Sequence, residues 1–187
     1  MRDAKRQALV AVAGEVFARH GYRRVNMKEI AAAAGISRPG LYLFFKTKEE
    51  IFSAAVLALA EGSIAKIVEG LPERATTQEK LRFAFEIWTV EIFELTLKSP
   101  EAKELSELSY DFARQALDEG YRRFEGVLAS ILKAHAKSSA TRLPLPAERV
   151  AHLLGSSARG FKLVAPNGAQ LRRMIHDLLR LTLPIDV

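Results

Sequence analysis

The chain contains no cysteine. Disulfides, thiol catalysis, thiol-based redox sensing and cysteine metal sites are therefore excluded. Its four histidines are scattered along the sequence, at His20, His135, His152 and His176, and lack carboxylates at metal-ligand spacing. We therefore expect no metal site and no cofactor.

Catalytic signatures are also missing. The sequence has no GxSxG, no glycine-rich phosphate loop, no HExxH and no evident nucleophile–base pair. These absences predict that the protein is not an enzyme.

Long hydrophobic runs and strand patterns are scarce as well. The longest charge-free apolar run in the central region, Ile51 to Ala60, is shorter than the roughly 20 residues of a membrane span. The N-terminus carries Asp3 and Glu15 and lacks a signal-peptide cleavage pattern. We expect a soluble cytoplasmic protein that does not bind a membrane. Since no β-alternation of useful length occurs, the predicted class is all-α, with about nine helices.

Positive charge is concentrated at one end of the chain. The 187 residues, 49% of them hydrophobic, suffice for one or two small domains, and the net charge is +6. Residues 1–50 hold ten Lys/Arg and five Asp/Glu, a net of +5, whereas residues 51–187 hold eighteen and seventeen, a net of +1. A basic face alone more often serves solubility, but beside a nucleic-acid-binding motif it indicates a polyanionic partner.

Residues 26–48 contain signals for closely spaced short helices. Asn26 and Glu29 have capping-box spacing, so a helix should begin at Met27. Gly35 suits the left-handed conformation that ends a helix. The pattern predicts a short alanine-rich helix followed by a turn.

A second helix should follow that turn at once. Ser37 can cap a helix from roughly Arg38 to Phe45, and Thr47 with Glu50 indicates a third start. Two helices joined by a short turn that contains glycine form a helix-turn-helix, a DNA-binding motif.

The segment GISRPGLYLFFKTKEEIF resembles the DNA-binding signature of the tetracycline-repressor (TetR) family of bacterial regulators. The matching residues are Gly35, Ile36, Ser37, Leu41, Tyr42, Phe44, Phe45 and Lys48. Phe44 departs from the family pattern, which often has His or Tyr there. The resemblance covers about the first fifty residues. It implies a three-helix helix-turn-helix domain (1–50) and a helical domain for effector binding and dimerisation (51–187).

DNA contacts are expected at the N-terminal end of the second motif helix, which faces base edges in the major groove. Arg38 is the candidate base reader, because guanidinium binds guanine O6 and N7 bidentately. Tyr42 and Lys48 are candidate phosphate contacts, while Leu43 could instead belong to the module's core. The full predicted DNA-contact set is Asn26, Lys28, Ser37, Arg38, Pro39, Gly40, Tyr42, Leu43, Phe44 and Lys48. Further attraction is expected from Arg2, Lys5, Arg6 and Lys46, and the module's core from Ile30, Ala31, Ile36, Leu41 and Phe45.

The remaining sequence predicts helices separated by loops. Helices are expected at about 3–19, 47–69, 76–98, 100–136, 146–163 and 168–183, with a break near 106–109 and loops at 70–77 and 137–145.

The last two predicted helices carry apolar stripes. Their residues are Val150, Leu153, Leu154, Ser157, Leu171, Met174, Ile175, Leu178 and Leu179. Such stripes either close the chain's own core or form a subunit interface, and periodicity does not separate the two. The resemblance favours a homodimer interface, because family members pair two such helices from each subunit.

An effector site is also implied by the resemblance, in a cavity among the middle helices. Its candidate residues are Phe83, Trp88, Phe93, Tyr110, Phe112, Tyr121, Phe124, His152, Ser156 and Phe161, with Arg159 on the same helical face as the last polar pair. Plain core packing is the competing explanation for each aromatic residue.

The predicted function is that of a ligand-responsive DNA-binding transcriptional regulator. It is expected to repress by binding a palindromic operator as a dimer and to be released by a small, mainly apolar effector. Two alternatives are a sequence-tolerant nucleoid-type DNA binder and a helical small-molecule-binding protein without specific DNA reading.

Overall fold

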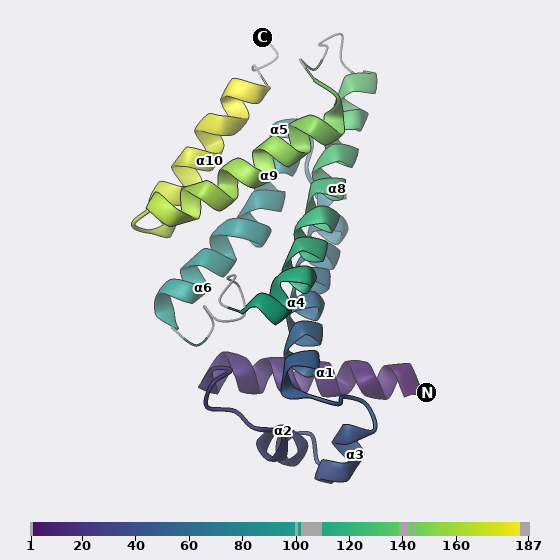
Figure 1. Ribbon diagram of the computed structural model, residues 1–187. Helices are drawn as coiled ribbons and strands as arrows, with labels where there is room; N and C mark the ends of the chain where they lie inside the picture. Colours follow the sequence, from purple (N-terminus) through teal and green to yellow (C-terminus); the bar gives the residue numbers. More distant parts are fainter. Residues whose placement is uncertain (1, 100, 102–109, 139–142, 144, 184–187) are drawn as a thin grey trace. The chain divides into compact units, whose positions relative to one another are not determined.

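The computed structural model describes residues 2–99, 101, 110–138, 143 and 145–183, which are helices and connecting segments without a strand (Figure 1). This confirms the all-α prediction. The chain forms two compact units. Unit 1 comprises Met1–Glu61 and Leu95–Gly120, and unit 2 comprises Gly62–Glu94 and Tyr121–Val187. The functional division into 1–50 and 51–187 stays a prediction.

Unit 1 begins with the predicted helices. They are α1 (Arg2–His20), α2 (Met27–Ala33), α3 (Arg38–Tyr42) and the first half of α4 (Lys48–Gly70). Gly35 follows the C-cap residue of α2 and has a φ of +65°, the left-handed conformation that the sequence predicted there. Helix α3 is shorter than expected, because after Tyr42 the chain turns so that the Phe44 and Phe45 N–H groups both donate to the Leu41 carbonyl.

The core of unit 1 holds the motif together. Fully buried side chains come from all four helices and the connection before α4: Phe17, Ile30, Leu41, Phe45, Ile51 and Phe52. The predicted module core is confirmed, with Ile30, Ala31, Leu41 and Phe45 buried and Ile36 packed against them. A five-residue helix is too short to be stable alone, so this burial is what maintains α3.

Helix α4 is more apolar than its charge-free run suggested. Among the described residues, the stretch Lys48–Glu73 contains an 18-residue segment with a mean hydropathy of 1.8, long and apolar enough to cross a membrane by length and composition alone. One such helix is weak evidence for a span. Its apolar residues also pack in protein cores, Ile51 and Phe52 in unit 1 and Ile67 in unit 2.

Unit 2 is a bundle of helices. The elements that contribute to it are the end of α4, a short 3₁₀ turn (Leu71–Glu73), α5 (Thr77–Phe85), a π-helical turn (Glu86–Glu91), the start of α6 (Ile92–Lys98), α8 (Arg114–Ser138), α9 (Ala147–Val164) and α10 (Gly168–Thr182). The helix predicted at 76–98 thus contains a π-helical interruption. Helix α8 extends to Ser138, into the predicted loop 137–145, and the predicted break near 106–109 lies outside the described residues.

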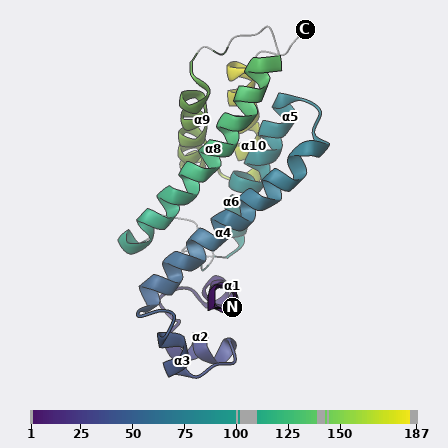
Figure 2. The ribbon, with the colours of Figure 1, turned by 90° about the vertical axis from the view of Figure 1, so that its right-hand side faces the viewer.

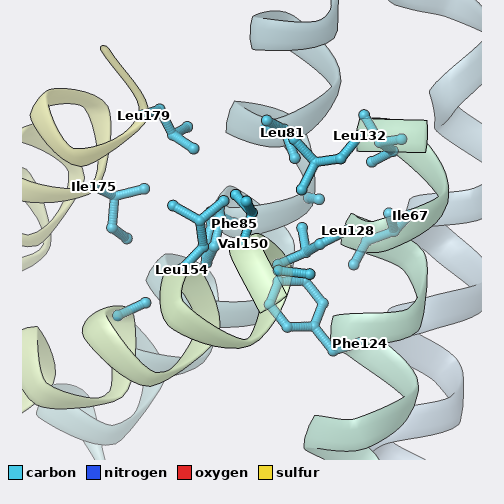
Figure 3. Packing of buried hydrophobic residues seen from close by; sticks show 14 of the residues in the cluster. Ile67, Leu81, Phe85, Phe124, Leu128, Leu132, Val150, Leu154, Ile175 and Leu179 are labelled. Carbon is cyan, nitrogen blue, oxygen red and sulfur yellow. The ribbon is translucent and has the colours of Figure 1, made fainter. Parts of the chain in front are cut away.

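The core of unit 2 resolves one ambiguity left by the sequence. Helices α9 and α10 lie side by side (Figure 2) and both contribute to this core (Figure 3). Five residues of the predicted interface are buried there: Val150, Leu154, Leu171, Ile175 and Leu179. For these five the interface interpretation was wrong, because they are buried in the core of their own unit, where α10 packs on α5, the π-helical turn and α9.

Candidate nucleic-acid interface and effector region

The helix starts of the motif are built by side-chain caps. The Asn26 side chain accepts hydrogen bonds from the N–H groups of Lys28 (3.0 Å) and Glu29 (3.2 Å), and the Glu29 carboxylate accepts one from the Asn26 N–H (2.9 Å). The Ser37 hydroxyl accepts from the Gly40 N–H at 3.1 Å. The side-chain oxygens of Asn26 and Ser37 therefore position α2 and α3, while the Asn26 amide protons and the Ser37 hydroxyl proton are not used in these caps, so their predicted DNA contacts stay predictions.

Helix α3 presents a continuous exposed surface. Arg38 and Pro39 at its start are exposed, and Leu43, just past its end, is 70% exposed, so the core alternative for Leu43 was wrong. The Arg38 guanidinium lies along the helix toward its C-terminal end, where it donates to the Tyr42 hydroxyl at 3.4 Å and lies 5.6 Å from the centre of its ring. Contact of Arg38 with a base would require this side chain to leave Tyr42.

Lys48 has internal partners that its sequence position did not reveal. Its ammonium donates to the carbonyls of Tyr22 and Val25, both at 2.9 Å, and lies 4.0 Å from the centre of the Tyr22 ring. The Lys48 ammonium therefore ties the start of α4 to the α1–α2 connection, and its predicted phosphate contact stays a prediction.

Cations of α1 gather beside α3. The Arg2 guanidinium and the Lys5 ammonium lie 6.0 and 5.8 Å from the centre of the Phe44 ring, and Arg6 lies 4.6 Å from that of Phe45. Cation–π attraction operates at these distances. The Phe44 ring thus contacts Arg2 and Lys5, for which the sequence predicted only a general attraction to DNA.

A cluster of aromatic rings packs in the core of unit 1. Tyr22 lies 4.7 Å from Tyr110 and 5.1 Å from Phe112, ring centre to ring centre, and Phe52 is 5.8 Å from both. Tyr110 and Phe112, which are predicted for the effector site, belong to unit 1, whereas the other candidates lie in unit 2. Their part in an effector site stays a prediction.

The Tyr22 hydroxyl also forms a polar contact. It donates to the Glu49 carboxylate at 2.7 Å. Burial raises the pKa of Tyr22, and the adjacent carboxylate raises it further. The same hydrogen bond lowers the pKa of Glu49, because it stabilises the ionised carboxylate.

Unit 2 contains a second aromatic cluster. The Trp88 ring is stacked on Phe124 at 4.7 Å with an interplanar angle of 7°, and it meets Tyr121 edge-on at 5.5 Å. Phe93 is buried, and Phe83 and Phe161 pack at the edge of the same core. Trp88, Tyr121 and Phe124 are thus brought together as the effector prediction requires.

The polar candidates lie elsewhere. His152 has a side chain that is 65% exposed and contacts the Glu125 carboxylate at 3.1 Å, and Ser156 is exposed. Instead, Arg159 and Lys162 of α9 approach Tyr121, at 4.1 Å from the ring centre and 3.2 Å from the hydroxyl. Lys162 was absent from the predicted site, since nothing in a sequence pairs α9 with α8.

The remaining interface candidates are accessible. Leu153 is exposed, and Ser157, Met174 and Leu178 are half-buried. Exposed apolar residues that the prediction omitted lie on the same two helices or at their ends: Leu163, Val164 and Leu181.

Comparison with known proteins identifies the helix-turn-helix segment. Residues 9–55 match the family of bacterial regulatory proteins described as the tetR family. The chain is 34% identical over 85 residues to the HTH-type transcriptional activator FasR of Mycolicibacterium smegmatis, covering 46% of this chain and 39% of that protein. It is 34% identical over 77 residues to the fatty acid metabolism regulator protein of Bacillus subtilis, covering 41% and 40%. The matches thus span about two fifths of these relatives.

The fold comparison extends over the whole chain. The structure of FadR from Bacillus subtilis in complex with stearoyl-CoA is similar with a TM-score of 0.62 at 21% identity, covering 95% of this chain and 97% of that one. The segment 9–55 thus matches the tetR family of bacterial regulatory proteins, and the fold of the chain is similar to that of FadR.

Proposed function

We propose that this protein is a ligand-responsive transcriptional regulator that binds DNA through α2 and α3. The observation that carries the proposal is the construction of α3. A helix too short to be stable alone is held by buried Leu41 and Phe45, with Arg38 exposed at its first turn. The cations of α1 beside Phe44 supply attraction to phosphates. Such a partner implies a cytoplasmic location.

We further propose a homodimer that binds a palindromic operator. One short recognition helix contacts few base pairs, and two-fold dimers solve this by reading two half-sites about one helical turn apart. The surface proposed for pairing is the outer side of α9 and α10. It carries Leu153, Gly160 and Val164 on α9, and Leu178 and Leu181 on α10.

The proposed effector is a fatty acyl compound that weakens operator binding. Support comes from the fatty acid metabolism regulator protein of Bacillus subtilis and from the similar fold of Bacillus subtilis FadR, which was crystallised with stearoyl-CoA. The cluster around Trp88 supplies apolar surface in this chain. A coupling free energy of about 1–3 kcal/mol would reduce operator affinity roughly 5- to 150-fold. On this basis we propose repression relieved by the effector.

Selection of bound sequences from a random DNA pool tests the proposal. The expected result is a palindrome with half-sites about 10 base pairs apart. Uniform binding of all sequences would favour the nucleoid-type alternative, and absence of binding would favour a small-molecule-binding protein without DNA reading. A promoter reporter carrying the recovered site then tests the sign, with repression expected and activation contradicting it.

A further inference from the structure

Two cations of α9 converge on one phenol ring in unit 2. The Arg159 guanidinium carbon lies 4.1 Å from the centre of the Tyr121 ring. The Lys162 ammonium donates to the Tyr121 hydroxyl oxygen at 3.2 Å and lies 5.9 Å from the ring centre. All three side chains are half-buried. Two like charges are thus held close together at one ring.

Neither cation of this pair has a carboxylate partner among the described residues, whereas two other cations of the unit do. Lys133 pairs with Glu148, and Arg172 with Glu86. Across the described parts of the chain, no carboxylate lies within ion-pair distance of Arg159 or Lys162. Mutual repulsion and partial burial both disfavour such an arrangement, and an anion bound between the two groups would relieve both.

The groups also match an anion in their hydrogen-bonding capacity. Guanidinium and ammonium groups are donors only. The Tyr121 oxygen already accepts from Lys162, so its own proton is available to donate. Within the described residues, no protein acceptor takes that proton. The site therefore offers donors from three side chains, the combination that carboxylate and phosphate oxygens accept.

The same ring also contacts apolar surface. Trp88 meets Tyr121 edge-on at 5.5 Å and stacks on Phe124. Trp88 lies in the π-helical turn Glu86–Glu91, and such turns inside α-helices occur frequently at functional sites. A single amphipathic molecule would contact both the donor groups and the indole.

We propose that Arg159, Lys162 and Tyr121 bind the anionic group of an acyl ligand whose apolar part packs against Trp88. The anionic group is a carboxylate or a phosphate. The proposal deepens the proposed function and rests on it only in treating this ligand as the effector.

The test uses the emission of Trp88, the only tryptophan of the chain. Laurate, lauroyl-coenzyme A, coenzyme A alone and the neutral dodecanol are titrated into the wild-type protein and the variants Arg159→Gln, Lys162→Gln and Tyr121→Phe. The matched control is Arg173→Gln, which removes an exposed positive charge on α10. Thermal melting confirms that each variant is folded.

The expected result is about a 10- to 100-fold loss of affinity for the anionic acyl probes in Arg159→Gln and Lys162→Gln, as for a lost charge-assisted hydrogen bond. Tyr121→Phe should lose less, and Arg173→Gln should behave as wild type. Dodecanol should bind all proteins equally. A loss for laurate identifies the carboxylate as the group bound, whereas a loss confined to lauroyl-coenzyme A, or shared with coenzyme A alone, identifies the phosphates.

Three outcomes overturn the proposal: no acyl probe binds the wild-type protein, the variants bind the anionic probes as the wild type does, or dodecanol loses affinity in parallel. Operator affinity measured in the same titrations distinguishes the anion site from the proposed effector role. If the probes bind through Arg159 and Lys162 but leave operator affinity unchanged, the anion site stands and the proposed effector role fails.

Discussion

Replacing Lys48 by methionine tests whether this residue stabilises the motif or contacts DNA. Methionine keeps most of the apolar stem and removes the ammonium. The change eliminates two hydrogen bonds of 2.9 Å from a charged donor to the carbonyls of Tyr22 and Val25, and a cation 4.0 Å from the Tyr22 ring centre. Each contact contributes about 1 kcal/mol at a half-buried position. We therefore expect a loss of about 2–4 kcal/mol in the free energy of unfolding.

The assay combines urea unfolding, followed by circular dichroism, with operator binding at several salt concentrations well below the melting temperature. If Lys48 is a structural tie, the folded variant should keep the wild-type dependence of log affinity on log salt. A lost phosphate contact lowers that slope by about 0.9, and hence by about 2 for both subunits of a dimer. Lys28→Met, which removes an exposed lysine at the start of α2, is the comparison that should show this flattening.

One combination of results would refute the reasoning. If Lys48→Met leaves unfolding within about 0.5 kcal/mol of wild type and flattens the salt dependence by about 2, Lys48 is a phosphate contact. Its hydrogen bonds to the two carbonyls would then contribute little.

Four further results are expected. Arg38→Ala should cost about 1–3 kcal/mol on the preferred operator and relax one base position per half-site, measured by selection from a DNA pool, whereas equal weakening of all sequences would remove Arg38 as the base reader. Gly35→Ala should lower the free energy of unfolding by about 1 kcal/mol or more in urea titrations, since φ is +65°, and an unchanged midpoint would contradict this. Leu153→Glu should give a folded monomer in sedimentation, with weakened operator binding, whereas a persistent dimer would exclude the proposed surface. Because the pKa of Glu49 is lowered, its hydrogen bond with Tyr22 stabilises the fold above the usual carboxyl range, and this stabilisation is lost as the pH falls through the lowered pKa. Tyr22→Phe should therefore reduce the acid dependence of the melting temperature. An unchanged pH profile would show that the pair is not linked to folding.

What the sequence determined by itself was local. The cap formed by Asn26 and Glu29 and the left-handed Gly35 depend on atoms within a few residues of each other, and both are confirmed. The helix-turn-helix could be identified from these signals because its geometry is specified turn by turn. The α3 boundary was the exception, since burial of Phe45 decides where the chain leaves the helix.

What only the tertiary structure decided was the choice of partner for each side chain. An apolar stripe specifies that a helix face is buried but not against what, and so Ile175 and Leu179 proved to be core residues of their own unit. An aromatic residue likewise packs wherever the chain brings it, as Tyr110 does beside Tyr22. Charged groups follow the same rule, because a lysine ammonium binds whichever carbonyl or phenol oxygen the fold places near it. For Lys48 and Lys162 those partners lie more than twenty residues away along the chain, beyond the range of any helical or capping pattern.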